Sequence, residues 1–208
     1  MNANIIPATD PNALKICLET LKTGGLVAFP TDTVYGLGCL VNRAGSIDRL
    51  YEVKGRDTSK AIAVLIGEID HLPQLTSGLG EIASELAAHF WPGALTLVVP
   101  RSPSLPENLS PLPTIGVRMP NHPFALALLR QAGPLATTSA NLSGLPSPVT
   151  ARDVLLQLNE RVDLIIDGGA CPGGVPSTVL DCTGADPRIL REGAITRSQL
   201  EKWIGRNF

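Results

Sequence analysis

The stretch LVAFPTDTVYGLGCLV, residues 26–41, contains two short apolar runs on either side of a polar turn. The first run, Leu26–Phe29, is continuous, and glycine and proline flank it. This pattern is typical of a strand that is covered on both faces, and residues 34–41 resemble it. Residues 30–33 form the predicted turn. Strands of this kind are typical of α/β layer folds.

Helical and apolar segments alternate along the rest of the chain. Apolar residues at helical spacing predict helices at 11–23, with Asp10 as its cap and Pro11 in its first turn, and at 47–54, 79–90, 123–131 and 151–159. A last helix begins with a capping box, Thr196 and Gln199. Apolar runs predict strands at 61–66, 95–99, 114–119, 135–138 and 164–166. Two close-set strand candidates, 177–182 and 188–191, indicate a mixed sheet, so we expect an α/β fold in a single domain, residues 1–208.

The composition limits the possible partners. The formal net charge is −2, so no overall field attracts RNA or an anionic membrane, and anion binding requires a locally basic cleft. The N-terminus lacks a signal-peptide pattern, and no apolar run reaches about 18 residues, so we expect a cytoplasmic protein without a membrane segment. The four cysteines have no CxxC spacing and are expected to be reduced thiols.

Several familiar catalytic motifs do not occur in the sequence. There is no P-loop, and Gly36-Leu37-Gly38 lacks the third glycine of the dinucleotide-binding fingerprint. The three histidines follow no metal-ligand pattern, and we assign no metal to protein side chains. No GxSxG nucleophile motif is present, so covalent catalysis by serine is not favoured.

Two short strings, Lys54-Gly55-Arg56 and Ser139-Ala140-Asn141, lie where a predicted helix or strand ends in a loop, and they carry groups that bind phosphate. Other basic residues, Lys60, Arg118 and Arg191, lie near turns. An arginine fork binds phosphate or carboxylate through two parallel hydrogen bonds, and lysine adds a compact charge. If these side chains converge in a cleft, they form a site for a polyanion. The alternative is that each is an ordinary solvated or ion-paired charge.

A series of strings occurs in an order and spacing that resembles the YrdC family, from about residue 13 to 200. They are Phe29–Gly38 (FPTDTVYGLG), Lys54–Arg56, Phe90–Gly93 followed by Leu95-Thr96, Val117–Pro120, His122-Pro123, Thr138–Asn141, Ser177-Thr178 and Leu190-Arg191. Many matched strings in one order are far more specific than any one of them. The resemblance implies a twisted α/β sheet flanked by helices, with a deep basic cavity.

The resemblance also implies an activity: synthesis of L-threonylcarbamoyl-AMP from L-threonine, bicarbonate and ATP with Mg²⁺, with release of pyrophosphate. This is the first step toward N6-threonylcarbamoyladenosine in tRNA, so threonylcarbamoyl-transferase machinery would act downstream, with a weak contact to tRNA. Residue by residue, it implies catalytic Lys54 and Arg56 and a threonine site of Thr33, Arg118 and Ser177. The implied ATP site consists of Arg56, Lys60, Thr114, Ser139, Asn141, Ser147 and Arg191.

The chain departs from the family pattern at two positions. Ala61 stands where members often have proline, and Leu65 stands where some have a histidine that contacts threonine. Because the chain ends at Phe208, it resembles the short, single-domain branch. Two other functions remain open: an RNA-binding or ribosome-maturation protein of the same fold, and a carbamoyl-transfer enzyme. The loops 101–113 and 142–148 are either lids or rigid surface loops.

Overall fold

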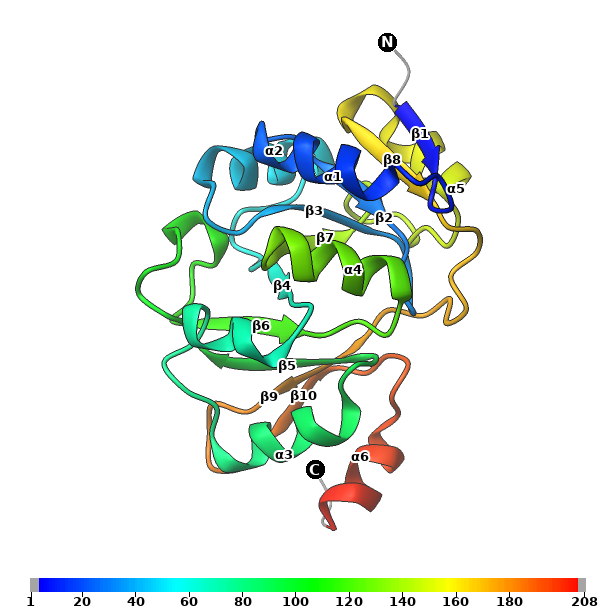
Figure 1. Ribbon diagram of the computed structural model, residues 1–208. Helices are drawn as coiled ribbons and strands as arrows, with labels where there is room; N and C mark the ends of the chain where they lie inside the picture. Colours follow the sequence, from blue (N-terminus) through cyan, green and yellow to red (C-terminus); the bar gives the residue numbers. More distant parts are fainter. Residues whose placement is uncertain (1–3, 206–208) are drawn as a thin grey trace.

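The computed structural model describes residues 4–205, and within them ten strands form one sheet (Figure 1). The strands are β1 (Asn4–Pro7), β2 (Val27–Phe29), β3 (Gly36–Leu40), β4 (Ala63–Leu65), β5 (Leu95–Pro100), β6 (Thr114–Arg118), β7 (Leu135–Ser139), β8 (Leu164–Asp167), β9 (Thr178–Asp181) and β10 (Arg188–Arg191). The helices are α1 (Ala13–Lys22), α2 (Ala44–Lys54), α3 (Glu81–Phe90), α4 (Pro123–Ala132), α5 (Ala151–Leu158) and α6 (Arg197–Ile204), with 3₁₀ helices at Ile69–Gln74, Glu107–Leu109 and Asn159–Arg161.

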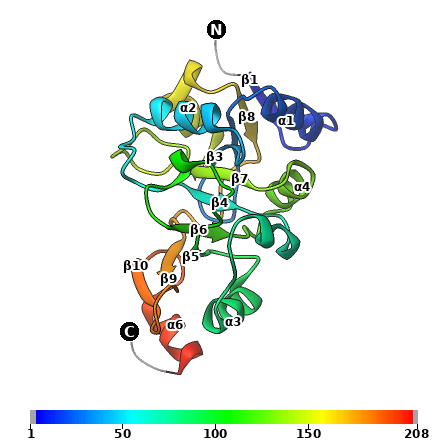
Figure 2. The ribbon, with the colours of Figure 1, turned by 90° about the vertical axis from the view of Figure 1, so that its left-hand side faces the viewer.

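The sheet is mixed, as predicted. Its strand order is β1-β8-β2-β3-β7-β4-β6-β5-β9-β10. The pairs β1/β8, β2/β8, β4/β6 and β5/β9 are parallel, and the other neighbours are antiparallel. The strands change direction from β1 and β8 at one end to β9 and β10 at the other, so the sheet is twisted (Figures 1 and 2). Helices flank it, which confirms the predicted fold class.

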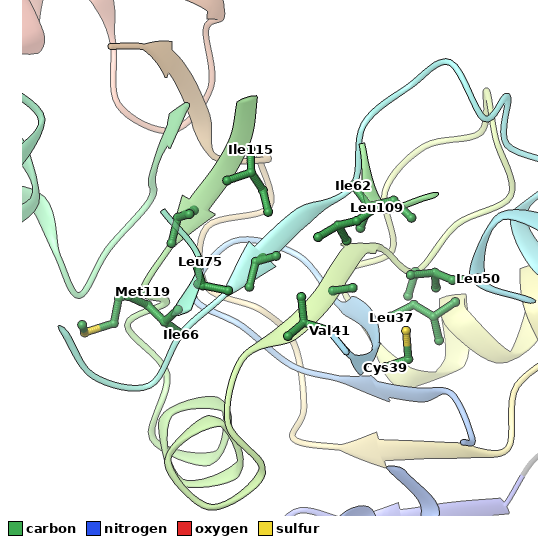
Figure 3. Close-up of a cluster of buried hydrophobic side chains, with 14 of the residues drawn as sticks. Leu37, Cys39, Val41, Leu50, Ile62, Ile66, Leu75, Leu109, Ile115 and Met119 are labelled. Atoms are coloured by element: carbon green, nitrogen blue, oxygen red, sulfur yellow. The ribbon is translucent and has the colours of Figure 1, made fainter. Parts of the chain in front are cut away.

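Apolar side chains are buried on both faces of the sheet. In β2, Val27 and Phe29 join one cluster and Ala28 joins the other, because successive side chains of a strand point to opposite faces. The larger cluster includes Leu37 of β3 beside Leu50 of α2 (Figure 3). The smaller cluster lies under α1 and α4. Double-sided burial of the opening stretch is therefore confirmed.

Two local predictions near the N-terminus were wrong or incomplete. The first helix begins at Ala13 and not at residue 11, because the Asp10 carboxylate accepts a hydrogen bond from the Asn12 backbone N–H at 2.7 Å and closes a turn before the helix. Strand β1 was not predicted. It lies at the edge of the sheet, three of its four side chains are exposed, and its apolar pair Ile5-Ile6 is too short to predict a strand. The capping box of Thr196 and Gln199 is confirmed.

Among residues 4–205, no helix is long and apolar enough to cross a membrane. The four cysteines are unpaired thiols.

Candidate active site

A cavity of about 480 Å³ lies against one face of the sheet, over its β3 to β10 portion. Its wall uses alternate residues of several strands, because alternate side chains share one face. The cavity-lining residues are 114, 116 and 118 along β6, 96 and 98 along β5, and 179 and 181 along β9. Of the predicted site residues, seven line the cavity: Thr33, Arg56, Thr114, Arg118, Ser139, Ser177 and Arg191.

Arg118, the last residue of β6, is buried and held on three sides. Its Nη2 lies 2.5 Å from Asp32 Oδ1, its Nη1 donates to Thr33 Oγ1 at 2.9 Å, and its Nε donates to the Gly93 carbonyl at 2.8 Å. A guanidinium has five N–H groups, so two remain for a ligand. Thr31 supports this arrangement, since its hydroxyl lies 3.0 Å from that of Thr33. The turn of the opening stretch therefore fixes an arginine at the cavity.

Arg56 reaches the cavity because the chain turns sharply after α2. Gly55 has a φ of 56°, the left-handed conformation that commonly ends a helix. The Arg56 guanidinium then donates to two carbonyls of the next loop, those of Lys60 at 3.3 Å and Ala61 at 3.0 Å. The middle residue of the KGR string is therefore a glycine because this position requires the left-handed backbone conformation.

Arg191 enters the cavity from β10. Its Nη2 donates to the Ser177 carbonyl at 2.8 Å, and its Nε donates to the same oxygen at 3.3 Å. The hydroxyl of Ser177 lies 2.8 Å from that of Thr96. Ser177 therefore carries a cavity hydroxyl and, through its carbonyl, also positions the Arg191 guanidinium.

Four arginines, Arg56, Arg118, Arg188 and Arg191, line the cavity and make it electropositive. Burial lowers the pKa of Arg56, Arg118 and Arg191. The charge of Arg56 lowers the pKa of Arg191 further, and the charge of Arg191 lowers that of Arg118, which shows that they repel one another. In the described part of the chain, the only carboxylate that lines the cavity belongs to Asp181. A polyanion would relieve the repulsion between the guanidiniums.

The other four predicted site residues do not line the cavity. Lys54 is buried, and its Nζ donates to the carbonyls of Ser139 and Asn141. The side chain of Lys60 is exposed. Asn141 donates to the Leu142 and Leu145 carbonyls at 2.8 Å, whereas its Oδ1 is buried without a hydrogen-bond partner among the described residues.

Ser147 lies in the loop before α5. The Tyr35 N–H donates a hydrogen bond to the carbonyl of the next residue in this loop, Pro148, at 2.9 Å. The ligand contacts suggested by the resemblance for Lys54, Lys60, Asn141 and Ser147 stay predictions.

Sequence reasoning missed several cavity residues. Thr96, Asp181 and Arg188 line the cavity, and Asp32 holds Arg118. Alternate residues of β5 and β9 share a face of the sheet, and this alternation could have grouped Thr96 with Val98 and Asp181 with Val179. It could not identify the cavity, because side chains cover both faces and only the tertiary structure shows which face borders a cavity. The two departures from the family pattern, Ala61 and Leu65, both line the cavity.

Comparisons with known proteins identify the family. The Sua5/YciO/YrdC family model, described as "Telomere recombination", matches residues 19–193. Threonylcarbamoyl-AMP synthase of Bacillus subtilis is 46% identical over 188 residues, which cover 89% of this chain and 54% of that protein. The putative threonylcarbamoyl-AMP synthase of Mycobacterium tuberculosis H37Rv is 40% identical over 186 residues, which cover 89% of this chain and 86% of that protein.

Solved structures give the same result. The crystal structure of Pyrococcus abyssi Sua5 complexed with L-threonine has a TM-score of 0.90 and 40% identity, and the match covers 94% of this chain and 58% of that one. The chain thus spans little more than half the length of the B. subtilis and P. abyssi relatives. The family model covers most of the chain, and the relatives share its sequence and fold, so this chain belongs to the Sua5/YciO/YrdC family.

Proposed function

We propose that the protein synthesises L-threonylcarbamoyl-AMP from L-threonine, bicarbonate and ATP and releases pyrophosphate, as the first step toward N6-threonylcarbamoyladenosine in tRNA. The observation that carries the proposal is the cavity in which Arg56, Arg118 and Arg191 meet among hydroxyl groups. All three substrates are anionic or carry an anionic group, which suits this cavity. The names of the B. subtilis and M. tuberculosis relatives support the assignment.

L-Threonine is proposed to bind beside Arg118. The guanidinium is held on three sides and keeps two N–H groups for the carboxylate of the amino acid. The hydroxyls of Thr33 and Ser177 line the same cavity and offer further hydrogen bonds. The L-threonine complex of the P. abyssi relative supports this substrate.

The nucleotide is proposed to bind between Arg56 and Arg191, with the hydroxyls of Thr114 and Ser139 as further contacts. The mutual repulsion of the two guanidiniums favours a polyphosphate at this place. Lys60, Asn141 and Ser147 complete the ATP site that we predict from the family pattern.

The reaction then proceeds in two steps. The amine of L-threonine and bicarbonate give a carbamate with loss of water. A carbamate oxygen attacks the α-phosphorus of ATP, the new P–O bond forms as the bond to the β-phosphate oxygen breaks, and pyrophosphate leaves. No protein nucleophile is needed. Arg56 and Arg191 stabilise the negative charge that develops, and fixed donors of this kind typically lower a barrier by about 3 kcal/mol each.

Mg²⁺ is proposed to accompany ATP. Across residues 4–205, no group of three or more His, Cys, Asp or Glu side chains is arranged to hold a metal ion. Phosphate oxygens and water usually supply most ligands of nucleotide-bound Mg²⁺. We therefore assign no protein residue to the ion and derive no step through it.

An omission assay tests the function. Pyrophosphate release is measured with all three substrates and with each one left out in turn. We expect release only when ATP, L-threonine and bicarbonate are present together. Equal release without threonine would contradict the proposal and indicate a plain ATPase. Salt-sensitive RNA binding without turnover would favour the RNA-binding alternative, and turnover that requires carbamoyl phosphate would favour carbamoyl transfer.

A further inference from the structure

Lys54 connects two segments that are far apart in the sequence. It is the last residue of α2 and is only 2% exposed. Its Nζ donates to the carbonyls of Ser139 and Asn141, and its own carbonyl accepts a hydrogen bond from the Ser143 N–H at 2.8 Å. One residue thus holds the end of β7 and the loop that follows it at three points.

The environment of Lys54 suits a fixed hydrogen-bond donor. Among the described residues, no carboxylate forms an ion pair with its Nζ, and the neighbouring charge is that of another cation, Arg56. Burial, with a contribution from Arg56, lowers the pKa of Lys54 to about 7. A neutral amine still has two N–H groups, one for each of the two carbonyls. These contacts therefore do not require the positive charge.

The two segments that Lys54 joins both carry cavity residues. Ser139 lies at the end of β7, opposite Gly36 of β3, and lines the cavity. Arg56 follows Lys54 by two positions and lines the cavity as well. The separation of Ser139 and Arg56 therefore depends on the contacts of Lys54.

We propose that Lys54 is a positioning residue: it fixes the loop 139–143 against the end of α2 and so sets the distance between Ser139 and Arg56, without contact with the ligand. This replaces the catalytic role that the sequence predicts for Lys54. The proposed function places the nucleotide at Ser139 and Arg56, so the expected effect on ATP binding rests on that function.

The first experiment compares Lys54→Met with Lys54→Gln and with a control, Lys15→Met. Met removes every donor, whereas the Gln amide keeps two N–H groups without a charge. Lys15 is 75% exposed, so its replacement tests the general effect of losing a lysine. Amide hydrogen exchange is measured for the segment 139–145, and KM and kcat are measured for ATP and for threonine.

For Lys54→Met we expect at least tenfold faster exchange in this segment and at least a tenfold higher KM for ATP, with the KM for threonine changed less than threefold. Lys54→Gln should recover part of both effects, and Lys15→Met should behave as the wild type. Unchanged exchange in Lys54→Met, or equal loss in the Met and Gln variants, would overturn the proposal.

The second experiment uses the wild-type protein and does not depend on the folding of a variant. In a crystal structure with a non-hydrolysable ATP analogue, Nζ should remain on the carbonyls of Ser139 and Asn141. An Nζ that leaves them for a phosphate oxygen would overturn the proposal. If the wild type binds no ATP analogue, the proposed function fails, whereas the exchange measurement still decides whether Lys54 fixes the loop.

Discussion

Arg118 and Asp32 form a buried ion pair in which Nη2 and Oδ1 lie 2.5 Å apart, and the two side chains are 7% and 14% exposed. The carboxylate comes from the turn after β2 and the guanidinium from the end of β6. Without Asp32, the buried charge of Arg118 would lose its counter-ion.

Replacement of Asp32 should therefore affect both stability and the binding of threonine. Breaking a buried pair by removing one partner typically costs about 3–5 kcal/mol. We expect Asp32→Ala to lower the free energy of unfolding by about 3 kcal/mol in urea denaturation and to raise the KM for threonine more than the KM for ATP. A loss below about 1 kcal/mol with an unchanged KM for threonine would contradict this account.

Arg56→Ala should reduce turnover in a protein that remains folded. The side chain makes two hydrogen bonds to loop carbonyls and lies in the cavity, where it is proposed to stabilise developing charge. Loss of one such donor typically costs about 3 kcal/mol, or roughly a hundredfold in kcat/KM. The matched control is Arg152→Ala at an exposed position of α5. Pyrophosphate release in the control should equal that of the wild type, and comparable losses in the two variants would argue against a specific role of Arg56.

The pKa of Lys54 predicts a pH dependence of stability. The pKa is about 7 in the fold, against 10.5 for an unperturbed lysine, so between these values the unfolded chain binds more protons than the folded one. Stability due to this group therefore rises with pH from about 7 toward 10.5, and the unfavourable contribution of the buried charge is complete below pH 7.

The measurement is the free energy of unfolding of the wild type minus that of Lys54→Met, taken between about pH 6 and 10. Subtraction removes groups that titrate alike in both proteins. We expect the difference to increase above about pH 7, and a constant difference would show that Lys54 titrates normally.

Two glycines should respond to alanine in opposite ways. A Cβ on Gly193 would lie 2.2 Å from the Pro176 carbonyl oxygen and 2.5 Å from the Ser177 carbonyl carbon, so the backbone beside the cavity has to move. We expect Gly193→Ala to destabilise the protein and to weaken ligand binding. Gly45, the second residue of α2, has no atom within 4 Å of such a Cβ, and Gly45→Ala should stabilise by about 0.4–1 kcal/mol because alanine lowers the conformational entropy of the unfolded chain. Thermal melts of both variants check the signs.

Most of the secondary structure could be predicted because each element carries its own signal. The continuous apolar run at β2 and the capping box of Thr196 and Gln199 are local patterns, and both are confirmed. Strand β1 has no such pattern, since its pairing with β8 and its exposed position depend on distant residues. The start of the first helix also escaped prediction, because the Asp10 carboxylate accepts a hydrogen bond from the Asn12 N–H, ahead of the helix, and does not cap it.

The residue types of the candidate site were determined by the sequence alone. The strings KGR and SAN, together with Arg118 and Arg191, indicate an anion site, and their order along the chain indicates the family, which the comparisons confirm. These conclusions require only the identity and spacing of residues.

Only the tertiary structure decided what each side chain faces. Arg56 and Arg191 line one cavity, whereas Lys54, two positions from Arg56, turns into the protein and binds the carbonyls of Ser139 and Asn141. The physical reason is that spacing fixes the face of a single helix or strand, but the choice between a hollow face and a packed one depends on elements that are distant in sequence. The sequence therefore determined the fold class and the residue types of the candidate site, and the packing of the sheet and helices decided which of these residues line the cavity.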